Sequence, residues 1–450
     1  MDPRLLSPAT WTEPLERMRA ALPEAAVSSR FSGTLSQSSF GGGERYLDES
    51  GDEFYLRRDG VQYSAMDALD AVSDLAPQAP LGVSIEVGRT TPPKVVLYEL
   101  PGEEVVNTGF SSPISAVVLR AGALPEPFRR LPEIHPRPWD QSMNPEWLAQ
   151  IVREALPDAT GMSEEQLQTW EQRHRCVLPP DVRALYLAAA QGDLIRPPKA
   201  GAEADSEADY VMRIFPLGRE DPYWRADARC GGWQSGANEV VGADPSGRVQ
   251  ALGFSPAWVP LGDDWGGNYF VADLAPGPNG TIGQILFVDH ETNSGASWVA
   301  PSLTAFVANP PQSYGGDLPP AAGLKVRIGN HTSETLASVT PETEVLIVNR
   351  VDEPVDLSGL AGHRRLRTLS ITPGPVSGVR TIPDLPALEY LETNLATWRF
   401  LLDRDLVPDR LLAAGFDDLR ADWPGLVAVA NELLRRWGRP TITEHVIQPG

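Results

Sequence analysis

Asp263 and Asp264 lie beside a tryptophan and two glycines in the stretch VPLGDDWGGNYFVADL, and they are the first groups in this chain to consider for chemistry. Two carboxylates act as an acid and base pair, or share a metal, only when they converge on one point. Neighbouring residues of an extended segment point to opposite faces, so adjacency works against convergence. A second candidate, His290 in DHETN, is followed by Ser-Gly, as turn residues are. The spacing therefore favours turns over a catalytic or metal site.

Other segments of the chain carry no catalytic signature either. The phosphate-loop pattern G-x-x-x-x-G-K-[ST], the zinc-protease pattern H-E-x-x-H and the nucleophile elbow G-x-S-x-G do not occur. FGGGER, residues 40–45, is glycine-rich but lacks the lysine and leads into a strand pattern, so we interpret it as a turn. The two cysteines, Cys176 and Cys230, have no partner at metal-ligand spacing. We predict no enzyme activity, no catalytic residue, no metal and no cofactor.

The opening stretch is instead predicted to be a turn that feeds a strand. Gly266 and Gly267 permit a sharp reversal, and the Asp and Asn residues around them have side chains that bond neighbouring backbone groups. Residues 269–274 alternate between two faces, as a strand does. Trp265 is then left to pack inside the protein or to be displayed.

The elements around this turn are predicted from capping and periodicity. Ser163 with Gln166 three residues later forms a capping box that starts a helix. LPPDVRALYLAAA, from residue 178, places prolines at the start of a second helix, and Ser302 caps a later one. The strands predicted between them are residues 239–244, 249–254, 258–262, 269–274 and 283–290.

Proline-rich joints divide the 450 residues into an α+β multidomain chain. The predicted parts are an α+β domain of unknown family at 1–132, a linker at 133–143, a central domain at 144–308, a linker at 309–323 and a C-terminal domain at 324–450. In the last part, pairs with L-x-x-L spacing recur at offsets of about 21 and then 22 residues, a period typical of leucine-rich repeats. The pairs are Val345 and Val348, Leu366 and Leu369, and Leu388 and Leu391. An ordinary α/β domain stays open as the alternative, and the helical ending is predicted to cap the last repeat.

The overall charge and composition restrict the partners. A formal net charge of −22 argues against nucleic acid, because binding to phosphates depends on clusters of cations. It favours a basic protein instead, although acidity can also serve solubility alone. The N-terminus lacks a signal peptide and no long apolar run occurs, so we predict a cytoplasmic protein that does not bind membranes. Lysine is rare beside arginine, which indicates a GC-rich, bacterial genome.

The ordered motifs SEEQLQTWEQRHRCVLPPDVRALYLAA, WVPLGDDWGGNYFVADL, GQILFVDHETN and SLTAFV resemble the SUKH superfamily over roughly residues 144–308. That family contains fungal cell-wall assembly regulators and bacterial immunity proteins that neutralise polymorphic toxins. The resemblance implies a central SUKH-like sheet flanked by helices, and protein binding without catalytic residues. The chain departs from the family pattern where Gln191 and Gly192 replace Asn-Gly and over the expanded segment 196–237, and these departures leave the partner undefined.

Binding of a protein is therefore the predicted function. Exposed Trp and Tyr side chains make good interface anchors. The predicted partner-binding residues are Trp224, Trp233, Trp258, Asp263, Asp264, Trp265 and Tyr269. The first hypothesis is an immunity protein that neutralises a toxin, possible partners including a basic toxin domain. The alternative is a regulatory scaffold that joins cellular proteins through the SUKH and repeat surfaces, and a hydrolase ranks third.

Overall fold

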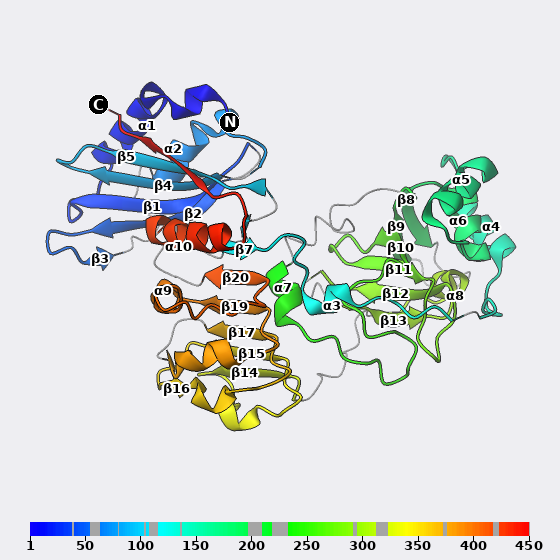
Figure 1. The fold of residues 1–450 in the computed structure, drawn as a ribbon. Coiled ribbons are helices and arrows are strands. Elements are labelled where there is room, and N and C mark those ends of the chain that lie inside the picture. The colour runs from blue at the N-terminus through cyan, green and yellow to red at the C-terminus, as the bar shows by residue number, and fades with distance from the viewer. Residues whose placement is uncertain are drawn as a thin grey trace. The chain divides into compact units, whose positions relative to one another are not determined.

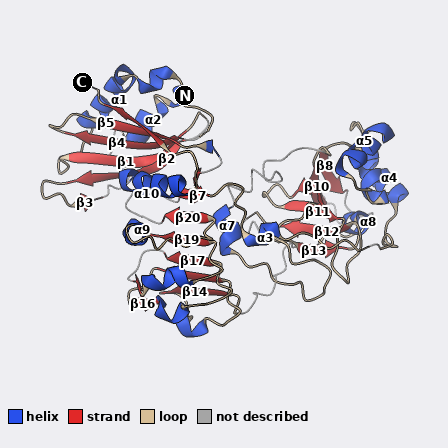
Figure 2. Ribbon diagram, viewed as in Figure 1, coloured by secondary structure: helices blue, strands red, loops and turns tan. Residues whose placement is uncertain are grey.

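The computed structural model of the protein describes residues 1–37, 40–54, 64–79, 81–102, 105–107, 116–135, 137–196, 209–217, 233–290, 295–311, 323–371, 376–416 and 423–449. These residues form helices and several sheets, an α+β architecture (Figures 1 and 2). The chain divides into two compact units, Leu124–Lys325 and a unit built from Met1–Ala123 together with Val326–Gly450. Among the described helices, none combines the length and the apolar character needed to cross a membrane.

The unit Leu124–Lys325 contains an antiparallel sheet with the strand order β13-β12-β11-β10-β9-β8. Its strands are β8 (Gly192–Arg196), β9 (Asp209–Ile214), β10 (Trp258–Asp263), β11 (Tyr269–Asp273), β12 (Gln284–Val288) and β13 (Ser297–Ala300). The strands predicted at 258–262, 269–274 and 283–290 are confirmed as β10, β11 and β12. Strands β8 and β9, which stand on either side of an acidic segment, were not predicted.

Helices of this unit share an apolar core with one face of the sheet. They are α4 (Pro145–Ala155), α5 (Glu164–His174), α6 (Pro180–Ala188) and α8 (Leu303–Ala308), and α7 (Trp233–Asn238) lies apart from them in Figure 1. Leu185, Leu261 and Phe270 are fully buried in this core. The predicted capping box is confirmed, because the Gln166 N–H donates to Ser163 Oγ (3.2 Å) and the Ser163 N–H donates to Gln166 Oε1 (2.7 Å).

Asp181 joins the starts of three helices. It is fully buried in the first turn of α6, and its Oδ2 accepts hydrogen bonds from the Thr304 N–H (2.9 Å) and Thr304 Oγ1 (3.2 Å) at the start of α8. Thr304 Oγ1 also accepts a hydrogen bond from the N–H of Asn144 (3.0 Å), the N-cap of α4. Helix starts present unpaired N–H groups and the positive end of the helix dipole, so a carboxylate suits this position. The aspartate of LPPD is thus a structural residue of the helix layer.

The two strands predicted at 239–244 and 249–254 are wrong, because the chain is irregular at 239–244 and has bends at 249–254. At the second segment the side chain of Asp244 is part of the physical reason. Its Oδ2 accepts hydrogen bonds from the N–H groups of Arg248 (2.9 Å) and Val249 (3.0 Å). Backbone groups that bind an aspartate side chain in this way are not available for a sheet ladder. The apolar side chains that suggested strands are buried in a small core that includes Trp258 and Val271.

The second unit contains two larger sheets, of which the first has the order β21-β5-β4-β1-β2-β3. Its strands are β1 (Ser28–Leu35), β2 (Phe40–Leu47), β3 (Glu53–Phe54), β4 (Leu81–Gly88), β5 (Lys94–Glu99) and β21 (Thr443–Ile447). Helices α1 (Pro8–Ala20) and α2 (Ala65–Asp70) share a core with it around Trp11 and Phe31. Residues 40–45, interpreted from FGGGER as a turn, instead form the first part of strand β2, which pairs with β3.

The other sheet is largely parallel and has the order β14-β15-β17-β19-β20-β7-β6. Its strands are β6 (Val105–Asn107), β7 (Ala116–Leu119), β14 (Lys325–Gly329), β15 (Val345–Asn349), β17 (Thr368–Ile371), β19 (Tyr390–Thr393) and β20 (Ala413–Phe416). Strands β15, β17, β19 and β20 pair in parallel. Their successive partners are Val345, Thr368, Tyr390 and Ala413, so equivalent positions recur at a nearly constant interval along the chain.

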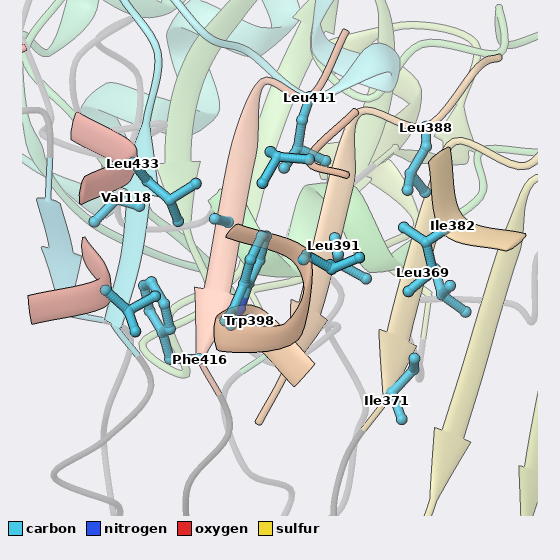
Figure 3. Packing of buried hydrophobic residues seen from close by; sticks show 14 of the residues in the cluster. Val118, Leu369, Ile371, Ile382, Leu388, Leu391, Trp398, Leu411, Phe416 and Leu433 are labelled. Atoms are coloured by element: carbon cyan, nitrogen blue, oxygen red, sulfur yellow. The ribbon is translucent and has the colours of Figure 1, made fainter. Parts of the chain in front are cut away.

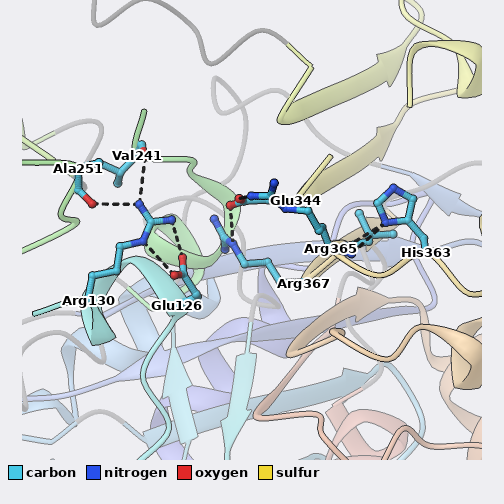
Figure 4. A network of polar contacts seen from close by, with 9 residues as sticks. Glu126, Arg130, Val241, Ala251, Glu344, His363, Arg365 and Arg367 are labelled. Atoms are coloured by element: carbon cyan, nitrogen blue, oxygen red, sulfur yellow. Dashed lines mark hydrogen bonds and ion pairs between the residues drawn. The ribbon is translucent and has the colours of Figure 1, made fainter. Parts of the chain in front are cut away.

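One backbone hydrogen bond recurs between successive parallel strands of this sheet, just before each strand begins. The N–H of Arg367 donates to the carbonyl of Glu344 (2.9 Å), the N–H of Glu389 to that of Arg367 (2.8 Å), and the N–H of Leu412 to that of Glu389 (2.8 Å). The side chain of Glu344 also binds Arg365 (2.7 Å) and Arg367 (3.4 Å), as Figure 4 shows. The repeated contact accounts for the sequence period.

The strand pairing differs by two residues from the sequence offset of the L-x-x-L pairs. That offset relates Leu369 to Val348, whereas the structure pairs Leu369 with Leu346. Positions two apart in a strand share one face, so both alignments bring apolar residues of the same face together. Leu369 and Leu391 lie with Trp398 in the core of this sheet (Figure 3).

Segments placed in separate predicted domains, 1–132 and 324–450, contribute strands to each other's sheets. β21 pairs with β5, and β7 pairs with β20, the last of the parallel strands. Helix α10 (Trp423–Arg436), predicted as the helical cap, packs into the core of this sheet, and β7 pairs with β20 beyond the last parallel strand. The short strand β6 pairs with β7 and forms one edge of this sheet, and very short edge strands limit unwanted pairing. Most of the linker predicted at 309–323 lies outside the described residues.

Candidate protein-binding site

The turn between β10 and β11 displays one large side chain. Trp265 is 57% exposed, and its backbone has φ +65°, in the left-handed region that a tryptophan rarely adopts. Gly267, two residues later, has φ +96° and completes the reversal predicted from the glycines. The turn thus holds an indole outward in a conformation that costs free energy unless neighbouring contacts stabilise it.

Asp264 supplies those contacts within the turn. Its Oδ1 accepts hydrogen bonds from the N–H groups of Gly266 (2.8 Å) and Asn268 (3.1 Å), and its Oδ2 accepts one from Asn268 Nδ2 (2.7 Å). Asn268 Oδ1 lies 2.8 Å from His290 Nδ1 and accepts the His290 N–H at 3.1 Å. The predicted Asx turn is present, and His290 braces it from the end of β12.

Asp263 faces the sheet and binds Arg213 of β9. The Arg213 Nε donates to Asp263 Oδ1 (3.0 Å), and a second guanidinium nitrogen donates to Oδ2. Asp263 is buried, and this paired hydrogen bonding raises the pKa of Arg213 above its usual range. The guanidinium carbon lies 4.2 Å from the centre of the Trp265 ring. Arg213 therefore covers one face of the indole and fixes its direction.

Neither aspartate is arranged for catalysis. One carboxylate is paired with Arg213 and the other is occupied by its own turn, so they do not converge on a shared ligand. Across the described ranges, no group of three or more His, Cys, Asp or Glu side chains has the geometry of a metal site. Tyr210, near these charges, has its pKa raised mainly by burial, which keeps the phenol protonated. The arrangement suits display of a side chain.

The other predicted partner-binding residues occupy different positions. Trp233 and Trp258 are buried, at 0% and 3% exposure, so both are core residues and offer no surface to a partner. The prediction that these two residues bind a partner is therefore corrected. A tryptophan beside a loop in the sequence can be buried in a core as readily as exposed at an interface. Tyr269 is half-buried with its ring 5.9 Å from that of Phe215. Trp224 lies outside the described residues.

Sequence reasoning missed Arg213, which organises the turn from a strand that was not predicted. Cross-strand register places it beside Asp193 of β8 and Asp263 of β10, so the three side chains form a row on one sheet face. The available signal was the alternation in DYVMRI, in which Met212 and Ile214 point to the core and the arginine points away. Its partners lie in distant segments of the sequence, and only strand pairing reveals them.

A buried aspartate also follows the turn, at the end of β11. Asp273 is fully buried, and desolvation raises its pKa to about 6 even though two hydrogen bonds favour the ionised form. Those bonds come from the Ala275 N–H (2.9 Å) and Gln284 Nε2 (3.0 Å). The Gln284 amide also donates to the Arg248 carbonyl (2.8 Å). This aspartate ties the strand end to neighbouring loops and is enclosed by protein, so it is structural.

Comparison with known proteins covers the same part of the chain. Residues 161–309 match the model of the SMI1 / KNR4 family (SUKH-1). A glucan synthesis regulatory protein from Neurospora crassa is 48% identical over 50 residues, which are 11% of this chain and 9% of that protein. The cell wall biosynthesis/cell cycle regulator smi1 of Schizosaccharomyces pombe is 28% identical over 144 residues, 30% of this chain and 27% of that protein.

This chain thus spans about a tenth and about a quarter of the length of these two relatives. Both relatives are fungal regulators by name, whereas a bacterial origin for this chain stays a prediction. The matched residues include helix α5, Asp181 with its contacts, the turn that displays Trp265, and helix α8. Residues 161–309 form an SMI1/KNR4 (SUKH-1) domain.

Proposed function

We propose that this chain is a non-enzymatic regulatory scaffold, which joins cellular proteins through its SUKH-1 domain and through the parallel sheet of the other unit. The names of the two fungal relatives, both regulators of the cell wall or of glucan synthesis, support the regulatory assignment. The observation that carries protein binding is Trp265, an exposed indole held in a left-handed turn by Arg213 and Asp264. A rigid aromatic side chain loses little entropy on binding.

The parallel sheet gives the proposed scaffold its second surface. Its parallel strands, which recur at a short and nearly constant interval, are compatible with a short leucine-rich-repeat-like array closed by β7. Such arrays contact partners through a regular surface. A scaffold needs more than one surface, and a chain of several sheets provides this.

The contacts of Trp265 also restrict the chemistry of its partner. The Arg213 guanidinium already occupies one face of the ring, so a second cation on the other face would be repelled. Asp263 is neutralised by Arg213, and the oxygens of Asp264 are used by the turn. The partner surface we propose is therefore an apolar or aromatic pocket. Toxin immunity remains the second candidate, supported by the net charge of −22, which favours a basic toxin.

Affinity capture with the full chain and its Trp265→Ala variant tests the proposal. Loss of a tryptophan anchor costs about 2 kcal/mol or more, which is about a 30-fold loss of affinity for a direct partner. Val177→Ser is the matched control, because Val177 is 66% exposed on the loop before α6. Cellular partners that bind Val177→Ser but not Trp265→Ala would support the scaffold. Partners that bind all three forms equally would refute the role of the turn, and neutralisation of a basic toxin would favour immunity.

A further inference from the structure

The segment after α3 (Glu126–Arg129), which leads into the SUKH-1 domain, is held by side-chain hydrogen bonds at Arg130 and at Glu133. The Arg130 guanidinium donates to the carbonyls of Val241 (3.2 Å) and Ala251 (3.0 Å), as Figure 4 shows. The same side chain pairs with Glu126 (2.8 Å). This part of the chain, predicted in part to be a linker, follows a fixed path over the domain.

A second clamp lies three residues further on. The N–H of Glu133 donates to Gln250 Oε1 (2.9 Å), and Gln250 Nε2 donates to the Glu133 carbonyl (2.7 Å). One amide thereby satisfies both backbone groups of Glu133, as a neighbouring strand would. Gln250 Nε2 also donates to the carbonyl of Ala275 (2.9 Å), two residues beyond the end of β11.

Two large apolar side chains point to solvent from this clamped path. Leu131 is 79% exposed and Ile134 is 68% exposed, the highest values among the large apolar residues described. Leu131 follows the Arg130 clamp and Ile134 follows the Glu133 clamp, so their exposure does not arise from a loose chain. Exposed apolar groups on a fixed backbone mark an interaction surface.

Spacing and proline content define the shape of this surface. Leu131 and Ile134 are three residues apart, with Pro132 between them and further prolines in the sequence at 136 and 138. Prolines and the residues before them favour the extended polyproline II conformation. That helix has three residues per turn, so positions three apart share one edge. Leu131 and Ile134 have this spacing.

We propose that residues 130–135 are a preformed ligand for a partner protein with a shallow, aromatic-lined groove of the kind that accepts polyproline II segments. Leu131 and Ile134 enter the groove. The Glu133 side chain is 79% exposed and lies 3.3 Å from His135 Nε2, and it meets a cation on the rim of the groove. Because Arg130 and Gln250 fix the backbone beforehand, binding costs little conformational entropy. The surface uses residues other than those around Trp265 and those of the parallel sheet, and gives the proposed scaffold a further partner.

The test is a binding array of purified polyproline-binding domains, of the SH3, WW and EVH1 types, probed with the full chain. We expect at least one domain to bind and to lose tenfold or more affinity for the double variant Leu131→Ser, Ile134→Ser. Val177→Ser is the matched apolar control and should leave binding unchanged. Gln250→Ala keeps both apolar residues but releases the clamp, so we expect an intermediate loss of affinity.

Three results would overturn the proposal: no domain binds, the double variant binds as well as wild type, or Val177→Ser loses as much. A fourth result would also overturn it: sedimentation shows that the full chain is a dimer, and the double variant is a monomer that keeps all of its array binding. The segment would then contact a second copy of this chain and not a polyproline-binding domain. Trp265→Ala separates this proposal from the previous one. The Trp265→Ala variant should bind the array as wild type does. If the turn bound no cellular protein, the proposed role of Trp265 would fail and the array result would still stand.

Discussion

Removal of the Asp181 carboxylate is expected to loosen the helix layer of the SUKH-1 domain. Asp181→Ala deletes the acceptor for two donors of Thr304, its N–H at 2.9 Å and its Oγ1 at 3.2 Å. A buried donor left without an acceptor costs about 1–3 kcal/mol, which gives roughly 2–6 kcal/mol for two donors. The carboxylate itself carries a desolvation penalty, which raises its pKa and is recovered in the variant. We therefore expect a net loss of about 3 kcal/mol.

The assay is hydrogen exchange in the full chain, read at peptides that contain α8 (Leu303–Ala308) and, for comparison, β17 (Thr368–Ile371) of the other unit. A loss of about 3 kcal/mol corresponds to exchange about 100-fold faster in α8 under native conditions. Peptides from β17 should be unchanged. This comparison reports on one unit without requiring the whole chain to unfold in a single step.

Two further variants separate the individual contacts. Asp181→Asn keeps one oxygen acceptor and should lose only about 1 kcal/mol. Thr304→Val removes the hydroxyl but keeps the N–H, and in combination with Asp181→Ala it should show a coupling energy of about 1 kcal/mol. If Asp181→Ala exchanges within about 0.5 kcal/mol of wild type at α8, or if the coupling is zero, the view of Asp181 as the junction of three helix starts is refuted.

Two other predictions concern buried groups elsewhere. The pKa of Asp273 is about 6 when folded and near its usual 3.8 when unfolded, so the native state binds more protons between these values and stability falls as pH rises. We expect the unfolding free energy of wild type, relative to Asp273→Asn, to drop by about 2.4 kcal/mol between pH 4 and pH 7 in denaturant titrations, and a flat difference would contradict burial as the cause. In the parallel sheet, a Cβ on Gly415 would lie 2.4 Å from Tyr390 Oη, so Gly415→Ala should lower the unfolding free energy by about 1–3 kcal/mol. Gly43→Ala is its control, because a Cβ there meets nothing within 4 Å, and an equal loss in both variants would show that close packing is not responsible.

Local signals in the sequence predicted local structure well. The capping box at Ser163, the strands β10 to β12 and the reversal at Gly267 depend on residues within a few positions of one another. The turn of Trp265 was recognised for the same reason, because Asx side chains bond to the backbone two to four residues away. Such features are readable because their physical causes are contiguous in the chain.

Long-range pairing was the part that sequence could not provide. Nothing in the composition of β21 indicates that it joins β5, which belongs to the first quarter of the chain, or that β7 closes the edge of β20. Arg213 was missed for the same reason, since its partner Asp263 is on a neighbouring strand of the sheet but far away in the sequence. The false strand at 249–254 shows the converse error. Its apolar residues Val249 and Leu252 are buried, but the Val249 N–H donates to the Asp244 side chain and the Leu252 N–H to the Gln250 carbonyl, so neither joins a sheet ladder.

Two of the proposed binding surfaces, the turn of Trp265 and residues 130–135, share one design, in which polar contacts fix the backbone or side chain behind an exposed apolar group. At the turn, Asp263 and Arg213 hold the indole of Trp265. On the entering segment, Gln250 holds the backbone between Leu131 and Ile134. In both places the polar groups satisfy one another inside the protein and the apolar groups are left to a partner, so affinity should depend on the fit of the pocket more than on salt. Binding at either surface that weakened steeply between about 50 mM and about 500 mM salt, in a chain with net charge −22, would assign recognition to the overall acidity and not to these side chains.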